Sequence, residues 1–449
     1  MMQAPDSVQG RGLLSPWLWA AFLLLLAFSP ASTKMGGTNW LVMALAGLYF
    51  MFRGKVRARG QDLDDDILRA SRVWLLACAA GLLIKMIGVL YWGDPIGTRH
   101  FDLRLFLGAL SIHFFVARVN LADAARRQLL AALLVAAVAG FVVSHVHATY
   151  NVPTPSNRIN WAGGLVMLSW VMLSATVCRR MSTAWHRAAV IGFLVFWLAI
   201  LMSGARAAYL SLPWALMVGA VLLISRLGSS YLRQGRWLLV TVFAVASLGS
   251  IVTLMEPKAV QVPMNRIAIA IEQAEDALGW GEQRTQIVDT SVGARIYMWQ
   301  RSLEVIKERP WLGYGREQRM AFVKEWGKEA NSGIVESQTH LHSEYINGMV
   351  DHGILGLFST LAYMVGLLAM AWVLKARHGL MALAVAGIAF THVTMSITDA
   401  NSQTNNYSVM MNLALMSIFL FRFGPVREGG DSRSGADVPQ GHRSGGMPQ

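Results

Sequence analysis

Long apolar runs alternate with short polar connections along most of the chain, and this alternation predicts membrane-spanning helices. A helix needs roughly 17 to 25 mostly apolar residues to cross the hydrocarbon layer of a bilayer. One connection, residues 256–345, is polar and much longer than the others. The twelve helices that the pattern predicts lie near residues 13–31, 37–52, 73–92, 103–118, 129–146, 160–178, 188–203, 208–225, 237–255, 346–374, 380–397 and 406–422.

The pattern divides the chain into four parts. Residues 1–255 carry the first nine spans, 256–345 form a helical loop, and 346–422 carry the last three spans. The tail, 423–449, is rich in Gly, Ser and Pro and is predicted to be disordered. The first apolar run has no convincing small-residue cleavage site, so we expect an uncleaved first span.

Lysine and arginine residues are concentrated on one side of the predicted membrane. They cluster in the connections after the second, fourth, sixth, eighth and tenth spans, whereas the opposite short connections hold only Lys34, Arg99, Arg158 and Arg206. Positively charged connections stay in the cytoplasm. The bias therefore predicts cytoplasmic termini and places the long loop outside.

The composition agrees with a polytopic membrane protein. Hydrophobic residues make up 54% of the chain and charged residues 14%, where soluble domains carry about 25% charged residues. The net charge of +13 comes from short clusters and gives no continuous basic face, so no nucleic-acid partner is expected. Cys78 and Cys178 lie in apolar runs, which argues against a disulfide framework or a thiolate metal site.

The long loop contains two stretches with helical apolar spacing. They are "VPMNRIAIAIEQAEDAL" (262–278) and "VGARIYMWQRSLEVIKERP" (292–310), and Pro310 with the glycines of "LGYG" is expected to end the second helix. The loop is too short for an independent enzyme domain. Long ordered loops are usually functional.

Three cations near the outer side need an explanation. Lys85 lies inside the third span, where it either reaches the interface or meets an anion in a polar cavity. Arg206, in "SGARAAYL", begins a helix and is either an ordinary interfacial arginine or a phosphate ligand beside free helix N–H groups. Arg295 lies near the amino end of a helix, where a bound anion would offset the unfavourable dipole.

Two histidines precede the tenth span, in "THLHSEYINGMVDHGILGL". His340 and His342 are followed by Glu344 and Tyr345, so a metal pair, a capping role and acid/base chemistry are all open. Histidines two residues apart share no helix face. We favour acid/base chemistry and expect no metal, because histidine titrates near neutral pH.

The chain lacks the motifs of soluble enzymes that bind nucleotides or hydrolyse esters and peptides. It has no P-loop, no glycine-rich dinucleotide turn, no H-E-x-x-H and no G-x-S-x-G. The cytoplasmic connections are also too short for a nucleotide-binding domain. We therefore expect chemistry without nucleotide at the outer face, on a substrate that is already activated, such as a lipid diphosphate.

Three segments resemble the O-antigen ligase family, within the superfamily of O-antigen polymerases and bacterial O-oligosaccharyltransferases. They are "SGARAAYL" (203–210), "VGARIYMWQRSLEVIKERPWLGYG" (292–315) and "HLHSEYINGMVDHGILGL" (340–357). The last segment fits the family pattern of a His, an Asn/Ser/Gln, nine residues and Gly-x-x-Gly. Its glycines, Gly353 and Gly356, suit close helix packing.

The resemblance implies an all-α glycosyltransferase of the bacterial inner membrane, similar to the metal-independent GT-C-like enzymes and using no cofactor. Such enzymes transfer a glycan from undecaprenyl diphosphate to the lipid A–core oligosaccharide at the periplasmic face. Arg206 and Arg295 match the diphosphate-binding arginines of the family, and His342 matches its essential histidine. Lys85 is a weaker match for the diphosphate, and His340, Tyr345 and Glu344 for supporting roles.

Three other functions stay open at this point. An O-antigen polymerase would use the same donor with a glycan acceptor, and a protein O-oligosaccharyltransferase would use Ser or Thr of a protein. A lipid-linked glycan flippase would bind without turnover, and its charges would be spread through the membrane interior. The single long loop and the cations at the outer face favour the ligase, with inverting transfer and His342 as the base.

Overall fold

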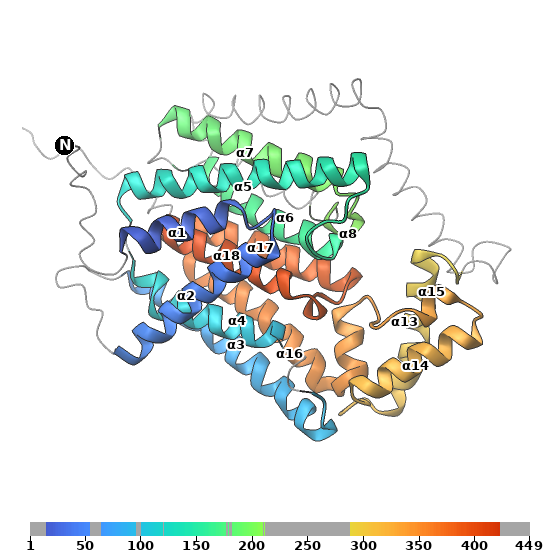
Figure 1. The fold of residues 1–449 in the computed structure, drawn as a ribbon. Coiled ribbons are helices and arrows are strands. Elements are labelled where there is room, and N and C mark those ends of the chain that lie inside the picture. The colour runs from blue at the N-terminus through green and yellow to red at the C-terminus, as the bar shows by residue number, and fades with distance from the viewer. Residues whose placement is uncertain are drawn as a thin grey trace, which may run out of the picture.

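The computed structural model describes residues 15–53, 64–95, 100–119, 121–176, 178, 182–209, 211 and 288–422, and every regular element in this part of the chain is a helix (Figure 1). The longer helices are α1 (Pro16–Ala27), α2 (Thr33–Arg53), α3 (Asp65–Trp92), α4 (His100–Phe114), α5 (Asp123–Tyr150), α6 (Arg158–Thr176), α7 (Thr183–Met202), α13 (Ser291–Glu308), α14 (Arg316–Glu329), α16 (Glu344–Leu374), α17 (Gly379–Thr398) and α18 (Asn405–Phe421). The short elements are η2 (Val116–Arg118), α8 (Arg206–Tyr209), α15 (Gly333–Glu336) and η3 (Asn401–Gln403).

The protein is an all-α polytopic membrane protein. Seven of the described helices are long and apolar enough to cross a bilayer: α2, α3, α5, α6, α7, α16 and α17. Helices α1, α4 and α18 coincide with three further predicted spans, but each of them is shorter than any of these seven helices. Two predicted spans lie outside the described residues. One is 237–255, and the other is 208–225 apart from its first residues in α8 and Ser211. The tail, 423–449, also lies outside them.

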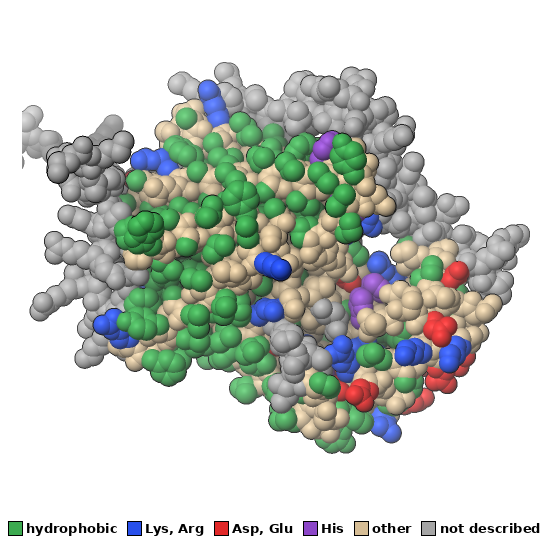
Figure 2. Space-filling model, in the orientation of Figure 1, with side chains coloured by type: hydrophobic (Ala, Val, Ile, Leu, Met, Phe, Trp, Pro, Cys, Tyr) green, Lys and Arg blue, Asp and Glu red, His purple; other side chains and the backbone are tan. Residues whose placement is uncertain are grey.

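Helices α6, α17 and α18 form the inside of the bundle, between α5 and α7 on one side and α2, α3 and α4 on the other (Figure 1). Almost every residue of α18 is buried, whereas the outer helix α3 exposes Leu76, Leu83 and Leu90. Hydrophobic side chains are spread over most of the visible face of the bundle (Figure 2). An apolar outer surface of this kind is the face that contacts lipid.

Glycines allow the helices of the bundle to approach closely. A Cβ atom added to Gly81 would lie 2.7 Å from the ring of Tyr363, and one added to Gly387 would lie 2.0 Å from the ring of Trp170. Close approach at small residues is the usual way in which membrane helices pack, because the bilayer gives no hydrophobic force between them.

Helix α16 is interrupted at His352 and Gly353, which corrects the prediction of one continuous span over 346–374. Gly353 has φ +59° and ψ −143°, a conformation that is almost restricted to glycine. The loop after α13 supplies the hydrogen bonds that the interrupted helix loses. Tyr314 N donates to Val350 O (2.9 Å), Gly315 N to Asp351 O (2.8 Å), and Ile354 N to Pro310 O (2.8 Å).

A small helical unit lies at one end of the bundle, and we call residues 288–351 the lid. It comprises α13, α14, α15 and the first turns of α16 around a separate core that includes Met298, Val323, Trp326 and Val350. The prediction of a helix within 292–310 is confirmed by α13. The other predicted helix, 262–278, lies outside the described residues. The lid core continues past the expected boundary at residue 345.

We expect Gly353→Ala to destabilise the protein by at least about 1–3 kcal/mol, the usual cost of a side chain in such a backbone conformation. An added Cβ would also lie 2.3 Å from the carbonyl carbon of Trp311. Thermal unfolding in detergent measures the effect. Gly37→Ala in α2, where a Cβ meets no atom within 4 Å, is the matched control and should unfold at or above the wild-type temperature. Equal stability of the two variants would contradict the role of Gly353.

Candidate active site

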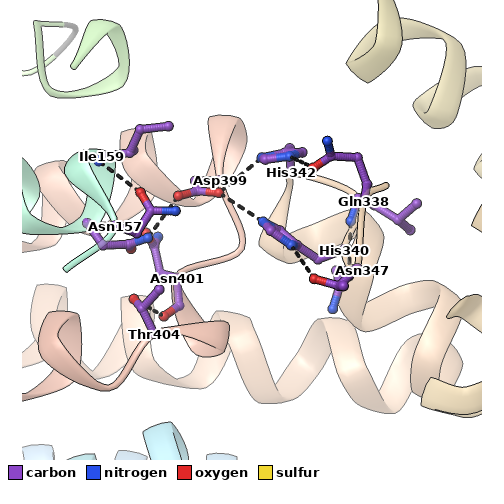
Figure 3. Close-up of polar contacts among 12 residues, drawn as sticks. Asn157, Ile159, Gln338, His340, His342, Asn347, Asp399, Asn401 and Thr404 are labelled. Carbon is purple, nitrogen blue, oxygen red and sulfur yellow. Dashed lines mark hydrogen bonds and ion pairs between the residues drawn. The ribbon is translucent and has the colours of Figure 1, made fainter. Parts of the chain in front are cut away.

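Three segments far apart in the sequence meet where the bundle joins the lid (Figure 3). The loop before α16 carries His340 and His342, Asp399 follows the last residue of α17, and Asn160 lies in the first turn of α6. Their side chains form one polar cluster that centres on the Asp399 carboxylate. The structure thus brings the two predicted histidines together with an aspartate that sequence analysis did not select.

His342 has a partner at each ring nitrogen. Nδ1 lies 3.2 Å from Oδ1 of Asp399, and Nε2 lies 2.7 Å from Oε1 of Gln338. The residue also has φ +50°, in the left-handed region that non-glycine residues rarely adopt. Rare backbone conformations of this kind are concentrated at functional sites. The imidazole is therefore held in one orientation by two hydrogen bonds and by its backbone.

Asp399 is buried and has three side-chain partners. Besides His342, His340 Nε2 lies 3.4 Å from Oδ1, and Asn160 Nδ2 donates to Oδ2 at 2.8 Å. Burial raises the pKa of the Asp399 carboxyl, but the hydrogen bonds and charges of the two histidines outweigh it and hold that pKa well below its usual range. Asp399 is therefore a carboxylate at neutral pH.

The environment of His342 favours its neutral form. Burial is the largest effect and lowers the pKa of the imidazole below 6.5, and the charges of His340 and Arg295 lower it further, whereas Asp399 opposes the shift. A neutral imidazole that donates Nδ1–H to a carboxylate carries its lone pair on Nε2, and Gln338 bonds to that lone pair when its amide is turned so that the NH2 group donates. Such a pair can accept a proton at Nε2, because the carboxylate stabilises the imidazolium that forms.

The histidine loop is attached to the lid by a buried network. Arg319 is fully buried in α14, where Nε donates to Asp351 Oδ1 (2.5 Å) and Nη1 to Thr339 O (2.5 Å). Asn347 Nδ2 donates to Asp351 Oδ2 (3.4 Å), and Asn347 Oδ1 accepts from Leu341 N (3.3 Å). The backbone on both sides of His340 therefore depends on one ion pair.

The predicted diphosphate arginines lie on two elements near this cluster. Arg295 is in the second turn of α13, half-buried and close enough for its charge to lower the pKa of His342. Arg206 begins α8 as expected, after Gly204 with φ +68°, and α8 packs against α6 and α17. The side chain of Arg206 lies outside what the structure describes.

The three residues that were predicted to support His342 make different contacts. His340 shares Asp399 with His342, and their ring centroids are 4.2 Å apart. Glu344 is buried and accepts from Ser402 N (3.0 Å), so it holds the segment after α17. Tyr345 donates to Met364 Sδ (3.1 Å) and Val393 O (3.4 Å), which places its hydroxyl between α16 and α17.

Lys85 forms a buried ion pair inside the bundle. Its Nζ lies 3.2 Å from Oδ2 of Asp102, and Tyr363 Oη donates to Oδ1 of the same carboxylate at 2.8 Å. Among the described residues, no hydrogen bond or ion pair joins these three side chains to the histidine cluster. The anion that balances Lys85 in this structure is therefore a protein carboxylate.

His340, His342 and Asp399 also have the donor atoms of a metal site. Their ligand atoms lie within 4.8 Å of one another, and two imidazoles with a carboxylate suit zinc. The same distances also fit hydrogen bonds from His340 and His342 to Asp399. The effect of a chelator on activity distinguishes a metal site from a hydrogen-bonded pair.

The chain matches the family model described as O-antigen ligase over residues 191–361. The match covers 171 of the 449 residues, so the similarity to this family concerns that part of the chain. The matched segment includes Arg206, Arg295 and His342, whereas Lys85 and Asp399 lie outside it. The match supports a glycosyltransferase of the ligase and polymerase type.

One curated relative, an uncharacterised protein of Haemophilus influenzae, is 26% identical over 182 residues. The match covers 39% of this chain and 41% of the relative, so the chain spans about two fifths of the length of the curated protein that it matches. The likeness is therefore limited to part of each chain.

We expect Asp351→Ala to destabilise the protein by about 3–5 kcal/mol, because it leaves the charge of Arg319 buried without its partner. Glu329→Ala is the matched control. It removes a carboxylate that is 46% exposed and bonded to Arg301 in the same lid, and exposed ion pairs are worth less than about 1 kcal/mol. Unfolding curves of both variants in detergent measure the difference, and equal shifts would refute a special role for the Arg319–Asp351 pair.

Proposed function

We propose that the protein is an O-antigen ligase. It transfers a glycan from undecaprenyl diphosphate to a hydroxyl of the lipid A–core oligosaccharide, with inversion and without metal or nucleotide. The reaction takes place at the periplasmic face of the bacterial inner membrane, at the end of the bundle that carries the lid, and both termini are cytoplasmic. The family match, the apolar helices and the positive-inside bias support this proposal.

The observation that carries the proposal is the His342–Asp399 pair. Asp399 accepts Nδ1–H and fixes the tautomer, so that Nε2 takes the proton of the acceptor hydroxyl. When the acceptor binds, its hydroxyl replaces the Gln338 amide as the hydrogen-bond partner of Nε2. His340 also bonds to Asp399 and acts as a positioning residue.

The proposed step balances atoms and charge. The acceptor oxygen forms a bond to the anomeric carbon on the face opposite the leaving group, which inverts the configuration. The bond between that carbon and the phosphate oxygen breaks, undecaprenyl diphosphate leaves with the electron pair, and the acceptor proton moves to His342. The charge that develops on the diphosphate is the part of the transition state that cations can stabilise.

We assign the diphosphate contacts to Arg206 and Arg295. Arg206 begins α8, which packs against α6 and α17, the helices of Asn160 and Asp399, and the charge of Arg295 acts on His342. A guanidinium binds a phosphate through two parallel hydrogen bonds. Lys85 stays in the proposal as an assisting cation, but Asp102 already balances its charge. Arg206 and Arg295 are therefore the first candidates for the site of the leaving group.

We expect His342→Gln to lower the rate of transfer about 10²–10⁴-fold, the usual contribution of a general base. The substitution preserves a polar side chain of similar size, so the protein should still enter the membrane normally. The assay uses purified protein, lipid-linked glycan and lipid A–core, and follows the ligated product on a gel. The control is Tyr345→Phe, because the Tyr345 hydroxyl bonds to Met364 and Val393 and to neither His340 nor His342, so its loss should change the rate little. Near-wild-type transfer by His342→Gln would overturn the assignment.

The rate should fall in acid as His342 becomes protonated, with an apparent pKa below 6.5 for wild type. Asp399→Asn removes a carboxylate that raises the pKa of His342, so this acidic limb should move to lower pH. The plateau rate should also fall, because the imidazole loses its fixed tautomer. The measurement is kcat/KM against pH for both proteins. An acidic limb that stays in place or moves to higher pH would show that Asp399 does not act on His342.

A further inference from the structure

A cavity lies in the lid, where α13 and α14 meet the end of α3. Its volume is about 670 Å³, within the range of roughly 300–1,000 Å³ that is typical of ligand pockets. It contains none of His340, His342 and Asp399. We call it the lid cleft, lined among others by Trp92, Arg301, Glu308, Tyr314 and Trp326.

Helix α13 separates the lid cleft from the histidine loop. Residues 301, 304, 305 and 308 line the cleft and follow one face of the helix. Trp299 contacts the histidine loop, because its Nε1 donates to Leu341 O at 2.7 Å. Positions 299 and 301 differ by about 200° around the helix axis. The cleft is therefore a separate site and does not belong to the place of the reaction.

Aromatic rings make up much of the cleft wall. Phe322 stacks on Trp326 with centroids 5.7 Å apart and an interplanar angle of 7°, and it meets Tyr314 edge to face at 5.0 Å. Trp92 completes the wall from the end of α3. A pyranose ring has a face of C–H groups that packs well against aromatic rings. The Tyr314 hydroxyl donates to Glu308 Oε2 (2.7 Å), and its oxygen can still accept a hydrogen bond from a sugar hydroxyl.

The polar groups of the cleft suit a neutral ligand with many hydroxyls. Glu304, Glu308, Glu325 and Gln318 are exposed and can accept or donate hydrogen bonds. The two arginines of the lining do not give an excess of positive charge, because three glutamates accompany them. Arg301 is already paired with Glu304 (2.9 Å) and with Glu329 (2.8 Å). A phosphate or an anionic lipid headgroup would require a basic site, so this lining disfavours both.

The position of the cleft at the end of a span also favours a ligand whose sugars are attached to a lipid in the bilayer. Trp92 Nε1 donates to Leu312 O at 2.7 Å and joins the cleft to the bundle. The neighbouring side chains Leu90 and Tyr91 are 67% and 61% exposed, as expected where a span leaves the membrane. Sugars that are attached to a lipid in the bilayer would pass this point.

We propose that the lid cleft binds sugar residues of a glycan substrate at a distance from the bond that is transferred. The proposal rests on the proposed function for the class of ligand. Two glycans share this chemistry: the chain on the lipid diphosphate and the core oligosaccharide on lipid A. Binding remote from the reacting bond holds the substrate in place, so its loss raises KM for that substrate.

The test measures binding of two lipid-free saccharides to the full-length protein in nanodiscs. The probes are core oligosaccharide released from lipid A and O-antigen polysaccharide released from its carrier, with calorimetry and saturation-transfer NMR as readouts. The variants are Tyr314→Ala and the double variant Gln318→Ala/Glu325→Ala, which alters exposed side chains. Glu317→Ala/Lys324→Ala on the same helix, outside the cleft lining, is the matched control, and unfolding curves check that all variants fold.

We expect at least one saccharide to bind wild type, and both cleft variants to bind it about tenfold more weakly while the control binds normally. The saccharide whose binding is weakened in the cleft variants is the occupant, which is either the donor glycan or the acceptor core. Equal binding by wild type and cleft variants, or no binding of either saccharide, would overturn the inference. His342→Gln should bind as wild type does. The result therefore does not depend on turnover, and a failed ligase assignment would show separately in the transfer assay.

Discussion

The buried carboxylate of Asp399 is the interaction on which the site depends. A charge that is removed from water costs several kcal/mol unless partners replace its hydration. Asn160 from α6 and both histidines of the loop before α16 supply those partners. One carboxylate thus joins α6, α17 and the lid, and it sets the tautomer of His342. The same contacts that make the charge tolerable also prepare the imidazole to accept a proton.

The interruption of α16 explains how the lid is attached to the membrane bundle. Gly353 allows the loop after α13 to approach the helix backbone, and the loop replaces the lost helical hydrogen bonds. Just before the interruption, Asp351 binds Arg319 of α14, and Asn347 connects this pair to the histidine loop. Movement of the lid would therefore disturb the backbone next to His342. The chemistry of the site and the packing of the lid are linked through these few residues.

The sequence was sufficient to predict most helices, because apolar runs measure the part of each helix that lies in hydrocarbon. It placed the start of α3 eight residues too late, since the first turns are polar and are capped by Asp64. The interruption of α16 was missed because apolar residues continue on both sides of His352. His342 and Arg295 carried recognisable patterns, but the partners Asp399 and Asp102 depend on contacts between distant segments. An acidic residue at the end of a span, on the same side as the histidines, is the signal that could have revealed Asp399.

The central claim is acceptor-dependent transfer by a histidine base without a metal. The most direct measurement supplies purified, chelator-treated protein with lipid-linked glycan, with and without lipid A–core, and omits ATP. The account predicts ligated product only when lipid A–core is present, at a rate that EDTA does not change. Glycan elongation without lipid A–core, or activity that returns only after a divalent ion is added back, would contradict it.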